Sequence, residues 1–183
     1  MLNLISETLW LFLPAITANM APVLFARYNW LPPLNKPLDG YKIWRGRRLL
    51  GDNKTVRGLI SGVVIGLLTG LIQFYASRLT ALSSISLIDY SAPITVITAG
   101  GLLAFSALAG DALASFFKRQ LNITPGQPWL PFDQIDFIIG AFLVGIFFAP
   151  LTLSHLVIAL TLIGSGSYLT SYISVTLKIK KSL

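Results

Sequence analysis

The sequence predicts an all-α integral membrane protein with five transmembrane helices, and composition, apolar run length and charge distribution each support this class. Hydrophobic residues make up 54% of the 183 residues, charged residues only 11%, and the mean hydropathy is +0.72. These values are typical of membrane proteins and exclude an ordinary soluble domain. Backbone polar groups in hydrocarbon are hydrogen-bonded within their own segment, so each long apolar stretch is expected to be a helix. The chain has no cysteine, which excludes disulfides and thiolate chemistry.

Five apolar stretches are long enough to cross a bilayer, which requires about 20 residues. In chain order the expected spans cover about residues 4–26, 58–77, 92–117, 133–150 and 151–177. Pro150 marks the turn between the last two, where the sequence is otherwise apolar. The more polar connections cover about 27–57 and 118–132, and residues 1–183 are expected to form one membrane-embedded domain.

Basic residues predict the orientation of these spans. The first connection is flanked or occupied by Arg27, Lys36, Lys42, Arg45, Arg47, Arg48, Lys54 and Arg57. The second connection has only Arg78, the third begins with Lys118 and Arg119, and the C-terminal tail carries Lys178, Lys180 and Lys181. By the positive-inside rule the N-terminus lies outside the cell membrane and the C-terminus inside. The first and third connections therefore face the cytoplasm.

The second span contains a regular series of glycines. Gly58, Gly62, Gly66 and Gly70 recur every four residues and fall on one face of a helix. Such a stripe lets a neighbouring helix approach closely, so we expect it to be a packing surface.

The first span has a polar residue between two prolines. Pro14 and Pro22 bracket Asn19, and a locally broken helix here would turn backbone carbonyls or the Asn19 amide toward a cavity that binds substrate. A proline kink in which Asn19 bonds a neighbouring helix explains the pattern equally well.

Three aspartates lie at or beside membrane ends of the third and fourth spans. The chain has only seven acidic residues, and a carboxylate deep in a membrane helix costs roughly 2.5–3.5 kcal/mol on insertion scales. Asp111, Ser115 and Lys118 share one helix face at spacing i, i+4, i+7, and Asp133 and Asp136 share another at i, i+3. Asp133 alone could be a helix N-cap, but three carboxylates together require a cation. Oxygen ligands without His or Cys favour Mg²⁺.

The end of the first connection, from Gly51 to Gly58, offers the opposite charge. A glycine turn followed by Lys54 and Thr55 at a helix start could present backbone N–H groups and an ammonium to phosphate oxygens. The spacing of the first glycine is not that of a Walker A motif. Positive-inside bias alone is an equally good explanation for Arg45 and Arg47.

These segments resemble the consecutive blocks of the CDP-archaeol synthase family, which is related to the CDP-diacylglycerol synthases. The matching blocks are ANMAPVL (18–24), GRRLLGDNKTVRG (46–58), GDALASFFKRQLNITPG (110–126) and PFDQIDFIIGA (131–141). The joint occurrence of S-F-x-K-R with D-Q-x-D is specific, and the order covers nearly the whole chain. Two positions depart from the expected pattern, Asn53 in place of histidine and Val56 in place of an aromatic residue, so the lipid or nucleotide contacts of the loop are in question.

The resemblance implies a five-helix membrane enzyme that transfers CMP from CTP to a lipid phosphate with Mg²⁺, releasing pyrophosphate. The lipid would be 2,3-di-O-geranylgeranylglycerol phosphate or a similar molecule, giving CDP-archaeol for phospholipid biosynthesis. We expect Asp111, Asp133 and Asp136 to hold the metal and Lys118 to act with them in catalysis. The expected contacts to nucleotide or lipid headgroup are Asn19, Arg48, Asp52, Lys54, Thr55, Arg57, Ser115 and Arg119. The expected partners are CTP, the lipid phosphate and the bilayer, with no nucleic acid.

Three other functions remain open from the sequence. A CDP-diacylglycerol synthase would act on phosphatidic acid, which presents the same phosphate. A small transporter also places carboxylates between helices, but here the acids lie at the inner boundary and the outer halves of the spans are nearly free of charge. A CDP-alcohol phosphotransferase requires a D-G-x2-A-R signature, whereas Asp39-Gly40 is followed by Tyr41 and Lys42.

Overall fold

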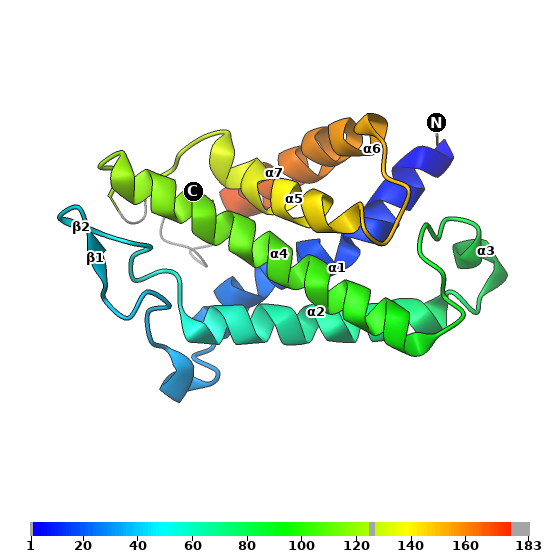
Figure 1. The fold of residues 1–183 in the computed structure, drawn as a ribbon, viewed down its shortest axis with the longest axis horizontal. Helices are drawn as coiled ribbons and strands as arrows, with labels where there is room; N and C mark the ends of the chain where they lie inside the picture. The colour runs from blue at the N-terminus through cyan, green and yellow to red at the C-terminus, as the bar shows by residue number, and fades with distance from the viewer. Residues whose placement is uncertain (1, 125–126, 177–183) are drawn as a thin grey trace.

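The computed structural model describes residues 2–124 and 127–176 as a bundle of helices that carries one small β-hairpin (Figure 1). The helices are α1 (Leu2–Arg27), α2 (Val56–Ala76), α3 (Thr80–Ser83), α4 (Pro93–Gln120), α5 (Phe132–Gly145), α6 (Leu153–Ile158) and α7 (Gly164–Thr176). A 3-10 turn, η1 (Pro32–Leu34), follows α1, and a π-helical turn, η2 (Ala159–Ile163), joins α6 to α7 in one continuous helix. The strands β1 (Ile43–Trp44) and β2 (Arg47–Arg48) pair antiparallel.

Four helical segments are long and apolar enough to cross a membrane. They are Leu2–Arg27, Val56–Ala76, Pro93–Gln120 and Leu153–Thr176. The α5 helix has 14 residues, which at 1.5 Å per residue is about 21 Å, shorter than a hydrocarbon core of about 30 Å. The described residues therefore contain four such spans, and the fifth, at α5, stays a prediction. The orientation also stays a prediction, and the tail lysines used for it lie outside the described residues.

The glycine stripe of α2 is a packing surface, as expected. A methyl group at Gly70 would stand 2.7 Å from the carbonyl oxygen of Val96 in α4, and one at Gly66 would collide with Ala104. At Gly62 the same group would lie 2.9 Å from the carbonyl oxygen of Ala18 in α1. The helices α1, α2 and α4 therefore meet in close contact along this stripe.

The helix α1 continues without a break through both prolines. Pro14 and Pro22 lie inside the helix, and the Thr17 hydroxyl bonds the carbonyl oxygens of Leu13 and Pro14. The expectation of a broken helix is wrong. The half-buried Asn19 has no side-chain hydrogen bond to the described residues, so its expected bond to a neighbouring helix is also absent there.

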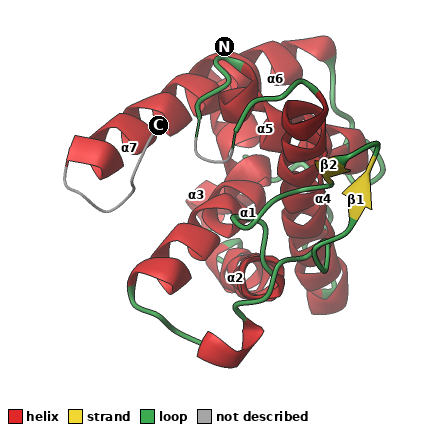
Figure 2. Ribbon diagram, turned by 90° about the vertical axis from the view of Figure 1, so that its left-hand side faces the viewer, coloured by secondary structure: helices red, strands yellow, loops and turns green. Residues whose placement is uncertain are grey.

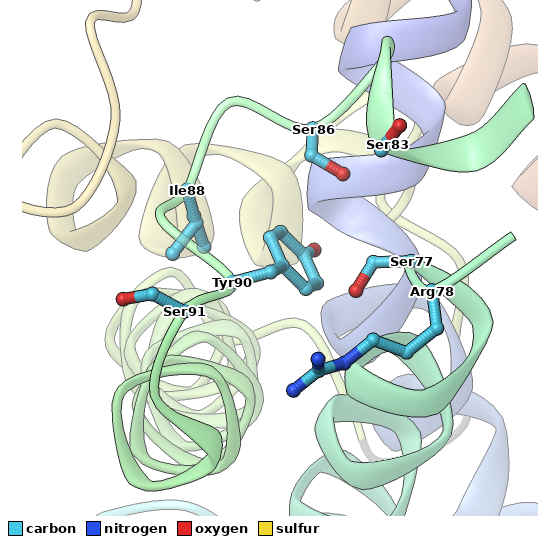
Figure 3. Close-up of a pocket in the computed structure, with 7 residues that line it drawn as sticks. All are labelled: Ser77, Arg78, Ser83, Ser86, Ile88, Tyr90 and Ser91. Atoms are coloured by element: carbon cyan, nitrogen blue, oxygen red, sulfur yellow. The ribbon is translucent and has the colours of Figure 1, made fainter. Parts of the chain in front are cut away.

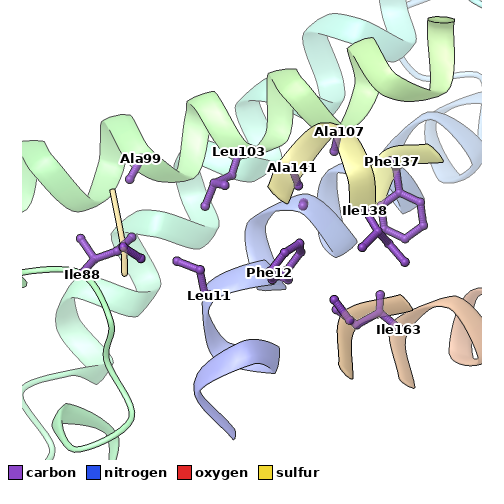
Figure 4. Close-up of a cluster of buried hydrophobic side chains, with 13 residues drawn as sticks. Leu11, Phe12, Ile88, Ala99, Leu103, Ala107, Phe137, Ile138, Ala141 and Ile163 are labelled. Carbon is purple, nitrogen blue, oxygen red and sulfur yellow. The ribbon is translucent and has the colours of Figure 1, made fainter. Parts of the chain in front are cut away.

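The buried core joins α1, α4, α5 and η2. Leu11 and Phe12 of α1 contact a group that includes Leu103, Phe137 and Ile163 (Figure 4). Many large apolar side chains point outward from the bundle instead, for example Ile72, Phe105 and Leu143. This distribution suits a bundle whose exterior contacts lipid rather than water.

Different elements lie at the two ends of the bundle. The hairpin, the start of α2, the end of α4 and the start of α5 lie at one end (Figure 1), and the end-on view shows the strands beside α4 (Figure 2). The start of α1, α3 and the start of α6 lie at the other end. The fold thus brings the basic first connection to the same end as the aspartates of α4 and α5.

Candidate active site

The α4 and α5 helices are in close contact next to the predicted carboxylates. A methyl group at Gly110 would lie 2.5 Å from the carbonyl oxygen of Asp136, and one at Gly140 would collide with the carbonyl of Ser106. Only glycine permits this approach. Asp111, which follows Gly110, is therefore brought beside the first turns of α5.

Two lysine–aspartate ion pairs connect the elements at this end. Lys54, just before α2, donates to Oδ2 of Asp111 in α4. Lys118 near the end of α4 donates to both carboxylate oxygens of Asp133 in α5, at 3.0 and 2.8 Å. The Trp129 backbone N–H also donates to Asp133, at 2.7 Å. Each pair thus joins one predicted phosphate-binding cation to one predicted metal ligand.

Two further charged side chains at this end, Asp136 and Arg119, have buried atoms with no hydrogen-bond partner among residues 2–124 and 127–176. Oδ1 of Asp136 accepts the N–H of Phe137 at 2.6 Å, but Oδ2 is buried with no hydrogen-bond donor. Nε and Nη1 of Arg119 are likewise buried without an acceptor. Leaving charged atoms buried and unsatisfied is costly. The carboxylate oxygen of Asp136 suits the binding of a cation, and the guanidinium nitrogens of Arg119 suit the binding of an anion.

The donor set fits a hard divalent cation, although the carboxylates do not already converge. Among the described residues, no three His, Cys, Asp or Glu side chains form a group that could hold a metal ion. Asp111 and Asp133 each hold a lysine instead, which supplies the positive charge that neighbouring carboxylates need. Carboxylate oxygens and the unpartnered Oδ2 of Asp136 are the ligand chemistry that Mg²⁺ prefers. The assignment of these three residues to a metal stays a prediction.

Backbone pairing holds Lys54 in place. The Leu38 N–H donates to the carbonyl of Lys54 at 2.7 Å, and the Val56 N–H donates to the carbonyl of Lys36 at 2.9 Å. The hydroxyl of Thr55 caps α2 by accepting the N–H of Gly58 at 3.1 Å. The loop before α2 is therefore a fixed support for Lys54.

Sequence reasoning missed the residue that organises this loop, Asp39. Its buried carboxylate accepts from Arg48 at 2.9 and 3.1 Å and from the backbone N–H groups of Tyr41, Leu50 and Gly51. Burial raises the pKa of Asp39, but the Arg48 guanidinium and the three N–H groups together lower it well below its usual value. The sequence signal that could have revealed this role is the pair Asp39-Gly40, which is typical of a turn and is followed closely by Arg45, Arg47 and Arg48.

The residues Arg48 and Asp52, expected at the substrate, are engaged in this network. Arg48 bonds Asp39 and, at 3.1 Å, the exposed Asp52. The bond with Asp39 raises the pKa of Arg48 further. Both residues lie in the first connection, and their contact with substrate stays a prediction.

The hairpin itself docks on the end of α4. Arg45 and Gly46 at its tip both have positive φ, as a two-residue type I′ turn requires. Behind the tip, Arg47 donates to the carbonyl of Gln120, and the Trp44 ring lies 5.6 Å from that of Phe116. The first and third connections are thereby joined, a contact between positions 73 apart that no local pattern predicts.

Three other expected residues are placed as follows. Arg57 is buried and directs its guanidinium toward Asn29 and the carbonyl of Trp30, at 3.3 and 3.4 Å, so it ties the start of α2 to the end of α1. Ser115 is buried on α4, between the two ion pairs in sequence. Asn19 lies in α1, outside the ion-pair network. Substrate contacts of all three stay predictions.

A pocket of about 360 Å³ lies between the first connection and the end of α4. Its lining is mostly apolar and comprises Leu38, Asp39, Lys42, Leu49, Leu50, Ala112, Leu113 and Phe116. Two of its lining residues, Ala112 and the exposed Leu113, follow Asp111 directly in α4.

Comparison with known proteins decides the family. The family model described as CarS-like, CDP-archaeol synthase, matches residues 1–183. The chain belongs to the CDP-archaeol synthase family.

Relatives named CDP-archaeol synthase occur in several archaea. The chain is 41% identical to the one from Thermococcus kodakarensis over 133 residues, which are 72% of this chain and 68% of that protein. It is 35% identical to the one from Methanocaldococcus jannaschii over 157 residues, covering 85% and 84% of the two chains. A solved structure of an intramembrane enzyme for archaeal membrane lipids biosynthesis shares 30% identity, covers 92% of both chains and superposes with a TM-score of 0.69.

Membership of the CDP-archaeol synthase family makes this chain a membrane enzyme, a cytidylyltransferase of lipid biosynthesis. This membership sets aside the transporter and the CDP-alcohol phosphotransferase.

Proposed function

We propose that the enzyme transfers CMP from CTP to an archaeol-type lipid phosphate, 2,3-di-O-geranylgeranylglycerol phosphate, with Mg²⁺. The observation that carries the proposal is the pair of lysine–aspartate bridges, Lys54 with Asp111 and Lys118 with Asp133, beside the unpartnered carboxylate oxygen of Asp136. The relatives named CDP-archaeol synthase support the lipid class.

In the proposed reaction a phosphate oxygen of the lipid attacks the α-phosphorus of CTP in line. The new P–O bond forms as the bond to the β-phosphate oxygen breaks, and pyrophosphate leaves with that electron pair. No protein nucleophile is needed, so the work of the protein is positioning and neutralising charge. Mg²⁺ held by Asp111, Asp133 and Asp136 would supply charge neutralisation on the phosphates.

The lysines have a second task in this proposal. Without ligands, Lys54 and Lys118 neutralise the carboxylates. If Asp111 and Asp133 held a divalent cation, the ammonium groups of Lys54 and Lys118 would be free to bind phosphate oxygens. Arg119, whose Nε and Nη1 lack acceptors, would bind a further oxygen of the triphosphate or of the leaving pyrophosphate. The site would open to the cytoplasm, from which CTP arrives, while the lipid enters from the bilayer.

The mostly apolar pocket beside α4 supports a lipid substrate. Its leucines and Phe116 suit hydrocarbon next to a phosphate, and Lys42 offers one positive charge. Ether-linked isoprenoid chains and acyl chains differ little in this respect, so phosphatidic acid remains the competing substrate.

The experiment is pyrophosphate release by the purified protein in detergent. CTP, Mg²⁺ and either the diether phosphate or phosphatidic acid are supplied, with EDTA as the metal-free arm. We expect release with the diether phosphate and none with EDTA. Equal rates with phosphatidic acid would contradict the lipid assignment, and no release with either lipid from folded protein would contradict the activity.

A further inference from the structure

A second pocket lies at the end of the bundle opposite the lysine–aspartate pairs. It has a volume of about 300 Å³ and is formed by the end of α2 and the segment that leads into α4 (Figure 3). Its lining residues are Ser77, Arg78, Ser83, Ser86, Ile88, Tyr90 and Ser91. None of them takes part in the proposed reaction.

Arg78 gives this pocket a positive charge that pairs with no carboxylate in the part of the chain that the structure describes. It is the only lysine or arginine between Arg57 and Lys118 in the chain. Its guanidinium lies over the ring of Phe74, 4.7 Å from the centroid, and it forms no ion pair with a carboxylate among the described residues. The nearest acid in sequence, Asp89, bonds Ser91 instead. A guanidinium stacked on an aromatic ring, whose N–H groups bond no described residue, suits the oxygens of a phosphate.

The serine hydroxyls supply the complementary chemistry. Ser77 donates to the carbonyl of Phe74 at 2.8 Å, Ser86 donates to the carbonyl of Leu82 at 3.0 Å, and Ser91 donates to Asp89 at 2.9 Å. A hydroxyl has one proton, so these three oxygens have only lone pairs left for a ligand. Arg78 is therefore a donor in this pocket and the oxygens of Ser77 and Ser91 are acceptors, while the hydroxyl of Ser86 also bonds that of Tyr90.

We propose that this pocket binds a phosphorylated polyol, such as the headgroup of a glycerol or inositol phospholipid. The phosphate would pair with Arg78, and the polyol hydroxyls would donate to the serine oxygens. A basic residue at the end of a membrane helix is common and would explain Arg78 alone, but not the set of acceptor oxygens around it. Leu79 follows Arg78 directly and Ile94 lies three residues after Ser91, and the exposure of both apolar side chains favours a ligand with lipid chains.

The test is native mass spectrometry of the full-length protein in detergent, titrated with phosphatidylglycerol, phosphatidylinositol or phosphatidylcholine. We expect the two polyol lipids to bind more tightly than phosphatidylcholine, whose headgroup carries no hydroxyl. Arg78→Gln should weaken polyol-lipid binding at least tenfold, and Ser91→Ala should reduce the preference over phosphatidylcholine. Arg45→Gln is the matched control, because Arg45 is also an exposed arginine stacked on an aromatic ring, Trp44, but at the other end.

Soluble glycerol phosphate distinguishes the two sources of this chemistry. Competition between glycerol phosphate and phosphatidylglycerol would support a lipid headgroup, and binding of glycerol phosphate without any lipid binding would support a soluble polyol phosphate. Unchanged binding of every probe in Arg78→Gln would overturn the proposal. Pyrophosphate release by Arg78→Gln should stay at the wild-type rate, which shows the variant is folded and separates this pocket from the catalytic site.

Discussion

Buried charged side chains determine what the hairpin end of the bundle can bind. Lys118 is 8% exposed and pairs with Asp133 through both carboxylate oxygens. Removing one partner of such a pair leaves the other charge uncompensated, which costs several kcal/mol. In Asp136, one carboxylate oxygen, Oδ2, is already buried without a hydrogen-bond partner among the described residues. The three aspartates are therefore expected to differ in their response to neutralisation.

The sharpest residue-scale prediction concerns Asp136→Asn. This change removes a proposed metal ligand but breaks no ion pair, so the protein should fold as well as wild type. We expect pyrophosphate release to fall about 100-fold or more, the size of effect seen when one electrostatic contributor to a transition state is lost. Thermal unfolding measured on the same sample provides the folding control. Wild-type turnover in a folded Asp136→Asn protein would remove Asp136 from the metal site.

At the scale of elements, Asp39 holds the first connection in its conformation, and the glycine stripe of α2 allows the close packing of the bundle. The loop has little regular structure, and five bonds to one carboxylate fix the backbone that carries Lys54. The helices instead rely on the absence of side chains at Gly62, Gly66 and Gly70. These two supports make different predictions.

Replacement of Asp39 by asparagine should loosen the loop. We expect a loss of about 2 kcal/mol in the free energy of unfolding, the worth of a hydrogen bond to a charged group. Because the folded-state pKa of Asp39 lies below its usual 3.8, the carboxylate stabilises the protein above pH 3.8 and loses this effect as the pH falls through the folded-state pKa. Melting temperatures of wild type and Asp39→Asn should thus differ at pH 7 and converge in strong acid.

Asp89→Asn is the control for that experiment. Asp89 is exposed and bonds only Ser91, so its neutralisation should change stability by less than about 0.5 kcal/mol. A difference between wild type and Asp39→Asn that stayed constant down to pH 2 would show that the charge of Asp39 is not what stabilises the loop.

Replacement of Gly66 by alanine should separate α2 from α4. The new methyl group would collide with Ala104 and stand 2.8 Å from the carbonyl oxygen of Gly100, and overpacking of this kind costs about 1–3 kcal/mol. Gly166→Ala is the matched control, because no atom lies within 4 Å of its added methyl group. There we expect unchanged or slightly raised stability, since alanine is the better helix former. Equal melting temperatures for the two variants would contradict the inference that the packing of α2 against α4 requires glycine at position 66.

At the scale of the whole molecule, α5 is shorter than the four apolar spans, with 14 residues, and whether it crosses the membrane sets the number of crossings. Figure 1 shows α5 running beside α4 toward the end that holds α3 and the start of α6. If the turn after α5 lies on the opposite side of the membrane from the hairpin, α5 crosses and the protein has five crossings. If the turn lies on the same side, α5 does not cross. The natural absence of cysteine makes that side measurable.

Single cysteines at three exposed positions should report the orientation. Arg45→Cys lies in the hairpin, Ser84→Cys follows α3, and Phe147→Cys follows α5. With a membrane-impermeant maleimide on intact cells, we expect labelling at positions 84 and 147 and protection at 45. Inverted vesicles should give the opposite pattern. Labelling of position 147 on the same side as position 45 would mean that α5 does not cross.

Several parts of the fold and site could be predicted from local patterns. Runs of apolar residues predict helices because hydrocarbon leaves the backbone no other partners. The spacing of Asp111 with Lys118, and of Asp133 with Asp136, predicts a shared face because the helix period is fixed. The glycine series predicts a contact face for the same reason. Helix ends were off by only a few residues, except that the last two spans are separated by the turn 146–152 and α5 is shorter than expected.

By itself the sequence determined the membrane class, the apolar helices and the residue types of the site, since each follows from composition or from periodicity along one helix. Only the tertiary structure decided which lysine meets which aspartate, that Asp39 anchors the loop, and that Arg47 and Trp44 dock on α4. These contacts join positions up to 73 apart, and chain spacing has no information about them. The same packing carries α1 unbroken through Pro14 and Pro22, against the local preference of proline to disrupt a helix.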